Sequence, residues 1–219
     1  MKKLLVFILL LATACAPAAA TATPTPAVIK VYTTAATQTW QADMFKCAAG
    51  ADTVLTLSDP GNADVLLHLG EPANLSMPSF QLGWEEILVV VNPSHSFQQL
   101  RTEQVTGLFT GAISDWSQVS ETETGAVQVW VFAQADDIQQ VFAKTLEGKP
   151  VSSSARLATS PQEMSDAIAR DPLAIGILSR RWKTGNLSDV YVAATAPILA
   201  ITPSEPQGAL KSLVACLQG

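Results

Sequence analysis

The 219-residue chain has few charged residues, no cluster of basic residues and, after residue 11, no long hydrophobic run. Only 15% of the residues are charged, whereas 48% are hydrophobic, and the formal net charge is −6. An acidic chain without a basic cluster is a poor match for nucleic acids or for an anionic lipid surface, so we exclude nucleic-acid binding. No stretch after residue 11 approaches the roughly 18 apolar residues that a membrane-spanning helix requires.

The sequence also lacks the short motifs that mark common catalytic and metal sites. It contains no Gly-x-Ser-x-Gly elbow, which would present a nucleophilic serine, and no Gly-Lys-Ser/Thr loop, which would cradle a phosphate. Its two histidines, His68 and His95, and its three cysteines show no short spacing of the kind that binds zinc. We therefore expect neither an enzyme nor a bound metal or cofactor.

Two pairs of adjacent carboxylates are the remaining candidates for acid–base chemistry. Asp136 and Asp137 fall at the predicted start of a helix, where neighbouring side chains point in different directions. Glu85 and Glu86 precede a predicted strand, which sends them to opposite faces. Neither pair is expected to act as an acid–base couple, and both pairs are expected to be solvated.

The first 15 residues have the pattern of an export signal. Lys2 and Lys3 precede an unbroken apolar run over residues 4–11. This run is too short to cross a bilayer as a mature helix but fits the hydrophobic region of a signal peptide. Cys15 follows the small residues 12–14, an arrangement that resembles the lipobox of bacterial lipoproteins, in which the cysteine becomes the lipidated N-terminus. The alternative is an ordinary cleaved signal followed by an incidental cysteine.

A segment of low complexity separates Cys15 from the rest of the chain. Residues 16–27, APAAATATPTPA, are small residues and three prolines that cannot bury enough apolar surface to fold. The expected organisation is therefore a signal peptide over residues 1–14 and a lipidated cysteine with a flexible tether over residues 15–27. A folded extracytoplasmic part would follow, anchored to the membrane through Cys15 at the cell surface or in the periplasm.

Cys47 and Cys216 remain as an even pair in an oxidising compartment. Cys47 lies on a helical pattern with Trp40 and Met44, and Cys216 flanks the apolar face of a predicted C-terminal helix. A disulfide between these helices would tie the start of the domain to its end. Two buried free thiols are the alternative.

From residue 28 the chain alternates between strand-like and helix-like segments. Apolar and β-branched runs predict strands at 29–32, 53–57, 65–69, 87–91, 127–132, 156–158, 174–178, 191–193 and 198–201. Apolar spacings of three and four predict helices at 38–48 and around 105–109, 138–146, 164–168 and 210–217. This alternation indicates the α/β class, with parallel sheets covered by helices on both faces. About 190 residues suffice for one large domain or two small lobes, and periodicity does not choose between them.

A longer motif carries a family resemblance. Residues 86–93, EILVVVNP, are followed by residues 108–119, LFTGAISDWSQV. These segments resemble the hinge and the start of the second lobe in the periplasmic phosphate-binding proteins of ABC importers (PstS-like). Residues 160–178 and 197–217 resemble, in the same order, a later helix and strand of that family and its closing strand and helix.

The resemblance implies a two-lobed type 2 periplasmic-binding fold, in which two hinge strands join two α/β lobes and a small ligand lies in the cleft. The implied lobes are residues 28–88 with 189–219, and residues 89–188. A disulfide between Cys47 and Cys216 would then stay within the first lobe and would not block closure of the hinge. Trp116 would be a core anchor, and we expect a monomer.

The resemblance also implies where an anion would bind, namely among three loops that supply hydroxyl groups, backbone amides and an arginine. In the first loop this chain has Thr33-Thr34-Ala35-Ala36-Thr37, which keeps hydroxyl and amide donors. The hydroxyls of Thr34 and Thr37 could equally be helix N-caps. Candidate ligand-binding residues here are Thr33, Thr34, Ala35 and Thr37.

The second and third loops depart from the family pattern. Where relatives have Ser-Arg, this chain has Leu69-Gly70, preceded by His68, which is a weaker candidate ligand residue. Where relatives have Arg and then Ser-Gly-Thr, residues 132–138 read FAQADDI, so that Gln134, Asp136 and Asp137 are the candidates. Two like charges about 4 Å apart repel by roughly 4 kcal/mol at an effective dielectric constant of 20, or about three powers of ten in affinity. The third loop therefore argues against tight phosphate binding.

We expect an extracytoplasmic solute-binding lipoprotein that hands a small ligand to an ABC importer permease. The ligand would be phosphate, another oxyanion or a less negative solute. The alternative is a binding-protein-like module without a transported ligand, acting in sensing or in protein–protein contact at the cell surface.

Overall fold

The computed structural model describes residues 26–219. The signal peptide, Cys15 and nearly all of the tether therefore lie outside the described residues. Within them, eight strands form one sheet: β1 (Ala27–Thr33), β2 (Thr53–Leu57), β3 (Val65–Leu69), β4 (Ser79–Val91), β5 (Gln128–Val131), β6 (Arg156–Leu157), β7 (Ala174–Ser179) and β8 (Ser188–Ile201).

The described part of the chain contains five α-helices and five short 3₁₀ helices. The α-helices are α1 (Gln41–Gly50), α2 (Thr102–Thr110), α3 (Asp137–Ala143), α4 (Pro161–Arg170) and α5 (Gly208–Leu217). The 3₁₀ helices are η1 (Gln38–Trp40), η2 (Pro60–Asn62), η3 (Trp116–Gln118), η4 (Lys144–Leu146) and η5 (Arg180–Trp182). None of the helices within residues 26–219 is long and apolar enough to cross a membrane.

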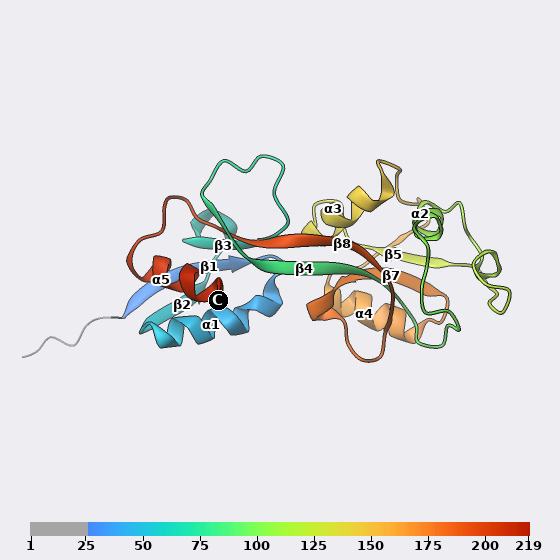
Figure 1. The fold of residues 1–219 in the computed structure, drawn as a ribbon, viewed down its shortest axis with the longest axis horizontal. Coiled ribbons are helices and arrows are strands. Elements are labelled where there is room, and N and C mark those ends of the chain that lie inside the picture. Colours follow the sequence, from blue (N-terminus) through green and yellow to red (C-terminus); the bar gives the residue numbers. More distant parts are fainter. Residues whose placement is uncertain (1–25) are drawn as a thin grey trace, which may run out of the picture.

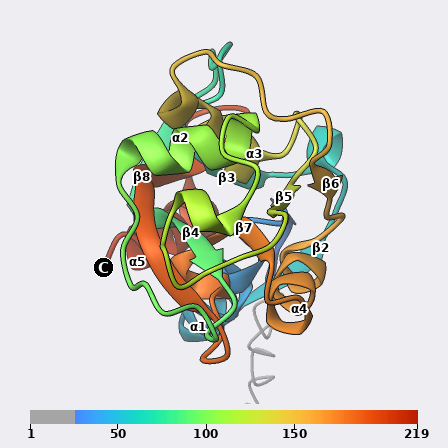
Figure 2. The same cartoon turned by 90° about the vertical axis from the view of Figure 1, so that its right-hand side faces the viewer.

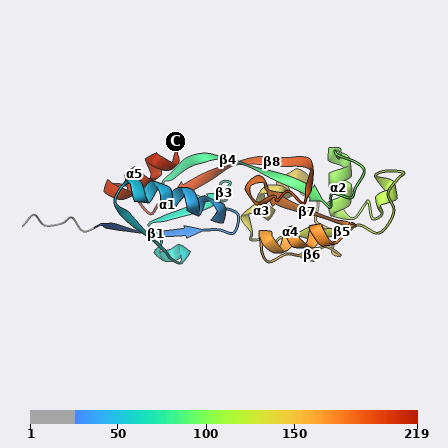
Figure 3. The same ribbon diagram turned by 90° about the horizontal axis from the view of Figure 1, so that it is seen from below.

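Two lobes lie side by side along the long axis of the molecule, and the long strands β4 and β8 run through both (Figure 1). One lobe contains β1, β2, β3, α1 and α5, and the other contains β5, β6, β7 and helices α2 to α4 (Figures 1 and 3). Seen from the end of the second lobe, α4 covers one face of the sheet, while α2 and α3 lie on the other (Figure 2). The fold is thus two α/β lobes joined by two strands.

The order of strands across the sheet is β2-β1-β3-β8-β4-β7-β5-β6. The expectation of parallel sheets holds at both ends, where β1 pairs in parallel with β2 and β3, and β5 with β6 and β7. It is wrong for the middle of the sheet, because β8 is antiparallel to β3 and β4, and β4 is antiparallel to β7. The reason is that β4 leaves the first lobe and β8 returns to it, so the two strands must run in opposite directions.

The predicted strands match the observed ones except in the segment between the lobes. Strands β2 and β3 have the predicted bounds, whereas β4 begins eight residues earlier than predicted, at Ser79, and β8 joins two predicted strands into one. Residues 79–86, SFQLGWEE, have only Leu82 and Glu85 buried. Because a ribbon that crosses between two lobes is not covered on both faces, these residues carry no continuous apolar signal.

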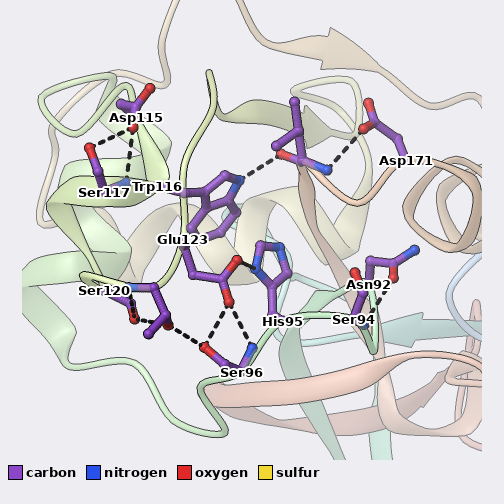
Figure 4. A network of polar contacts seen from close by, with 12 residues as sticks. Asn92, Ser94, His95, Ser96, Asp115, Trp116, Ser117, Ser120, Glu123 and Asp171 are labelled. Carbon is purple, nitrogen blue, oxygen red and sulfur yellow. Dashed lines mark hydrogen bonds and ion pairs between the residues drawn. The ribbon is translucent and has the colours of Figure 1, made fainter.

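The second lobe is anchored on Trp116, as expected. Trp116 is fully buried, and its indole Nε1 donates a hydrogen bond to the carbonyl of Leu173 at 3.0 Å. His95 packs against this indole with ring centroids 4.4 Å apart, and its Nδ1 lies 3.1 Å from the carboxylate of Glu123. Glu123 also accepts the backbone N–H of Ser96 at 2.8 Å (Figure 4). This network fixes the far end of the second lobe and does not involve the cleft.

The predicted disulfide is confirmed. Cys47 of α1 is bonded to Cys216 of α5, with their Cα atoms 5.8 Å apart. Both helices belong to the first lobe (Figure 1), so the bond joins chain segments 169 residues apart without crossing between the lobes.

Removal of this disulfide is expected to lower the stability of the domain. A loop this long contributes up to about 5 kcal/mol in the chain-entropy model, and measured values are commonly about 2–4 kcal/mol. We therefore expect a Cys47→Ser/Cys216→Ser double variant to lose about 2–4 kcal/mol in urea unfolding. A reducing agent should lower the wild-type protein to the same level and leave the double variant unchanged. A wild-type stability that does not respond to the reducing agent would contradict this role.

Candidate functional site

Three loops meet between the lobes, and the contact is made by Asp137. The loop after β1 contributes Thr34, whose hydroxyl donates to Asp137 Oδ2 at 2.6 Å. The end of β3 contributes the backbone N–H of Leu69, which donates to the same oxygen at 3.1 Å. Asp137 is the first residue of α3 in the second lobe. The three loops predicted from the sequence are therefore brought together by a carboxylate of the chain itself.

Asp137 is buried, which corrects the expectation that the Asp136–Asp137 pair is solvated. Only 3% of its surface is exposed, and its second carboxylate oxygen, Oδ1, has no hydrogen-bond partner within residues 26–219. The cause of the burial is the meeting of the two lobes. A sequence pattern that places a residue at a helix start does not show that another lobe covers it.

The other residues of the first loop have structural partners. Thr37 is fully buried, and its hydroxyl donates to the carbonyl of Leu67 at 3.0 Å and makes no capping bond at the start of η1. Thr33 Oγ1 accepts a hydrogen bond from Gln41 Nε2 at 2.7 Å. The carbonyl of Ala35 accepts the indole N–H of Trp182 at 3.1 Å. Of this loop, Thr34 alone directs its hydroxyl at the carboxylate from the other lobe.

Asp136 caps α3 and has other partners than Asp137. Its carboxylate oxygen Oδ1 accepts the backbone N–H of Ile138 at 2.9 Å, whereas Asp137 Oδ2 accepts from Thr34 and Leu69 of the first lobe. Burial and the neighbouring charge of Asp137 raise the pKa of Asp136 from 3.8 to about 6, although hydrogen bonds from the helix backbone and the nearby His68 oppose the rise. At neutral pH Asp136 is therefore largely ionised.

A cavity of about 1220 Å³ opens beside this contact. Its first-lobe wall is the end of β3 and the loop after it, including His68, whose Nδ1 lies 3.0 Å from the carbonyl of Gly70. Its second-lobe wall is largely apolar, with polar groups from three glutamines and two lysines: Val131, Phe132, Gln134, Gln139, Gln140, Val141, Lys144, Leu146, Lys149 and Leu157. His68 and Gln134 thus line a cavity, while Asp136 and Asp137 lie outside its lining.

A second set of contacts between the lobes lies at η5 and was missed by the sequence analysis. Arg181 pairs with Asp43 of α1 at 2.9 Å and stacks over the ring of Trp40 at 4.0 Å. The indole of Trp182 reaches the first loop at Ala35. The run Arg180-Arg181-Trp182 directly after a buried strand was the signal that could have indicated this contact.

The pair Glu85–Glu86 belongs to this second set of contacts, and the expectation that the pair is solvated is wrong for Glu85, whereas the side chain of Glu86 is 38% exposed. Glu85 is 4% exposed and accepts the backbone N–H of Arg181 at 3.1 Å, while Glu86 pairs with Arg180. Burial raises the pKa of Glu85, and the hydrogen bond and charge of Arg181 partly offset the rise. These carboxylates hold η5 against the crossing segment of β4.

No protein-family model matches the chain, and no curated protein sequence matches it either. Solved structures do match. A putative phosphate ABC transporter substrate-binding protein with bound phosphate from Clostridium perfringens has a TM-score of 0.78 at 11% identity, covering 87% of this chain and 92% of that chain. An ABC-type phosphate transport receptor from Vibrio cholerae has a TM-score of 0.66 at 16% identity, covering 88% and 93%.

The chain has the PstS-like type 2 periplasmic-binding fold. The same fold occurs in the reduced OxyR regulatory domain from Pseudomonas aeruginosa, with a TM-score of 0.62 at 12% identity, covering 88% of this chain and 98% of that chain. The neighbours are thus binding proteins and regulatory domains. At sequence identities this low, the structural similarity establishes a shared fold and does not establish a shared function.

The pKa of Asp136 gives a testable dependence of stability on pH. Because the pKa of Asp136 is higher in the folded state than in the unfolded state, protonation of Asp136 stabilises the fold. This stabilisation is complete below pH 3.8 and is lost as the pH rises through about 6. Asp136→Asn keeps a capping side chain without the charge. We expect its free energy of unfolding to exceed that of the wild-type protein by about 1 kcal/mol at pH 8, a value reduced for partial exposure.

The difference between Asp136→Asn and the wild-type protein should shrink to zero below pH 4, as measured by urea unfolding across the pH range. The same comparison for Asp171→Asn, whose carboxylate accepts the backbone N–H of Leu173 at 2.9 Å elsewhere in the second lobe, controls for general effects of the substitution. A difference that is equal at pH 4 and pH 8 would contradict the buried-charge account.

Proposed function

We propose that the chain is an extracytoplasmic solute-binding lipoprotein that binds a small ligand between its lobes and delivers it to an ABC importer permease. The observation that supports this most is the cavity of about 1220 Å³, whose walls come from both lobes. Ligand pockets are mostly apolar clefts with a few polar groups that fix orientation. The mixture of aliphatic side chains, Phe132 and glutamines in this cavity has that character.

The ligand we propose is less negative than phosphate. The donors at Thr34 and Leu69 already bond to the Asp137 carboxyl group, and Asp136 carries a negative charge at neutral pH. A dianion entering here would meet repulsion with its donors already taken. The adjoining cavity offers apolar surface and amide groups, and the charges of its two lysines, Lys144 and Lys149, are partly offset by Glu71, so the ligand we propose is an uncharged solute with both polar and apolar parts.

The cellular setting is also part of the proposal. We place the lipid anchor at Cys15, the tether over residues 15–27 and the lobe boundaries at residues 88/89 and 188/189. The protein would act as a monomer, without catalysis, in the periplasm or at the cell surface.

A ligand-independent module for sensing or protein–protein contact is the second candidate. One specific observation favours it, because the contact that joins the lobes is made by the chain's own Asp137 and needs no solute. The OxyR regulatory domain shares the fold at a TM-score of 0.62, so the fold also serves in regulation.

A solute screen separates the two candidates. Isothermal calorimetry and thermal shift on the domain that follows the tether should detect no phosphate or sulfate binding but should detect at least one neutral solute from a panel of sugars, nucleosides and amino-acid amides. Gln134 is an exposed residue of the cavity lining, so the larger side chain of Gln134→Trp should obstruct entry of the solute and weaken the binding signal. Gln98→Trp, in an exposed loop of the second lobe, is the matched control and should bind normally.

Three outcomes of this screen would contradict the proposed ligand class or the solute-binding function. Phosphate binding in the micromolar range would overturn the proposed ligand class. No response to the whole panel would favour the ligand-independent module, and so would a neutral solute that binds Gln134→Trp as tightly as Gln98→Trp.

A further inference from the structure

The contact between Asp137 and the first lobe has the chemistry of a bound anion. A hydroxyl and a backbone amide from two separate segments of the first lobe, at Thr34 and Leu69, both donate to one carboxylate oxygen, at 2.6 and 3.1 Å. Hydrogen bonds to an ionised acceptor are among the strongest in proteins. The acceptor, however, is supplied by the second lobe and is part of the same chain.

The surroundings of Asp137 are those of an enclosed ligand. The side chain is 97% buried, and its second oxygen has no hydrogen-bond partner within residues 26–219. Thr37, which is fully buried, packs beside Thr34 with the two hydroxyl oxygens 3.1 Å apart. The Thr34 hydroxyl and the Leu69 amide thus converge on one carboxylate oxygen, and a free carboxylate in place of the side chain would meet the same two donors.

We infer that Asp137 is an intramolecular ligand and determines the specificity of the cleft: its carboxylate occupies the donors of Thr34 and Leu69, excludes external anions from them and holds the lobes together without a solute. The inference concerns closure of the lobes and does not depend on whether a solute is transported. With Asp137 removed, the free donors of Thr34 and Leu69 would bind a small monocarboxylate.

Other contacts between the lobes limit what loss of Asp137 can do. Trp182 donates to Ala35, Arg181 pairs with Asp43, and Thr145 of η4 donates to the carbonyl of Ala193 in β8 at 2.9 Å. These contacts lie at η5 and along β8 and do not use the donors that bind Asp137. Loss of the carboxylate should therefore loosen the cleft, while the two lobes stay folded and joined.

Chemical rescue by formate tests the inference. Asp137→Ala removes the carboxylate and leaves a space next to the two donors. We expect this variant to have a larger radius of gyration in small-angle X-ray scattering and a lower melting temperature than the wild-type protein. Formate should reverse both changes, and the affinity of the variant for formate in calorimetry should be at least tenfold higher than that of the wild-type protein.

The matched control is Asp171→Ala, which removes a half-buried aspartate of the same lobe together with one hydrogen bond from a backbone N–H, that of Leu173. It should lose stability without expanding and should not respond to formate. An Asp137→Ala variant with the wild-type radius of gyration and no response to formate would overturn the inference.

If Asp137→Ala does not fold, two further measurements test the same inference. Asp137→Asn keeps the size of the side chain and loses its charge, so it should expand part of the way. The wild-type protein should keep the same radius of gyration with and without formate or phosphate, because its donors are already occupied. A wild-type protein that becomes more compact on addition of either anion would overturn the inference.

Discussion

The antiparallel pairing of β4 with β8 is the constraint on which the rest of the structure depends. The two strands pair from Ser79↔Ile201 at one end to Val91↔Ser188 at the other, so a single ribbon carries both lobes. Strand β3 adds to β8 from Ile198 onward, and β7 adds to β4 from Ile87 onward, which leaves a short stretch between them with neither neighbour. Register shifts at Gln81/Gly83, Ile87/Leu88 and Val89/Val90 interrupt the pairing, and such irregularities let a ribbon twist and bend.

The ribbon brings the loops of the two lobes face to face, and electrostatics then decides what the cleft can hold. One side of the junction is closed by Asp137 with the donors of the first lobe, and the other by η5, whose arginines pair with Glu85, Glu86 and Asp43. The arginines of η5 are thus committed to carboxylates of the chain, whereas Lys144 and Lys149 line the adjoining cavity. The carboxyl group of Asp137 takes the donors at Thr34 and Leu69, and this contact is the basis on which we propose an uncharged solute or none.

Much of the fold followed from the sequence because its signals are local. The apolar runs at 65–69 and 87–91 and the helical spacing around Ile168 each depend on neighbours in the chain, and each predicted the observed element. The disulfide also followed, since an even pair of cysteines on two helices left few alternatives. The two crossing strands were predicted by the family resemblance alone, and their full length was not predicted, because Pro197 and Gly83 suggest a break unless the partner strand is known.

The candidate site was predicted in its location but not in its chemistry. The resemblance identified the loops at Thr34, His68 and Asp136, and the structure brings these loops together. That Asp137 would be buried against Thr34 and Leu69 depends on residues 68 to 103 positions away, which no periodicity encodes. The same holds for Arg181, which meets Asp43 across 138 residues.

A crystal structure of the domain that follows the tether, grown without phosphate or carboxylate buffers, tests the central claim most directly. We predict lobes in contact, with a carboxylate oxygen of Asp137 within hydrogen-bond distance of the Thr34 hydroxyl and the Leu69 amide. Lobes that are parted with Asp137 in solvent, or a solute bonded to Thr34 and Leu69 in place of Asp137, would contradict it.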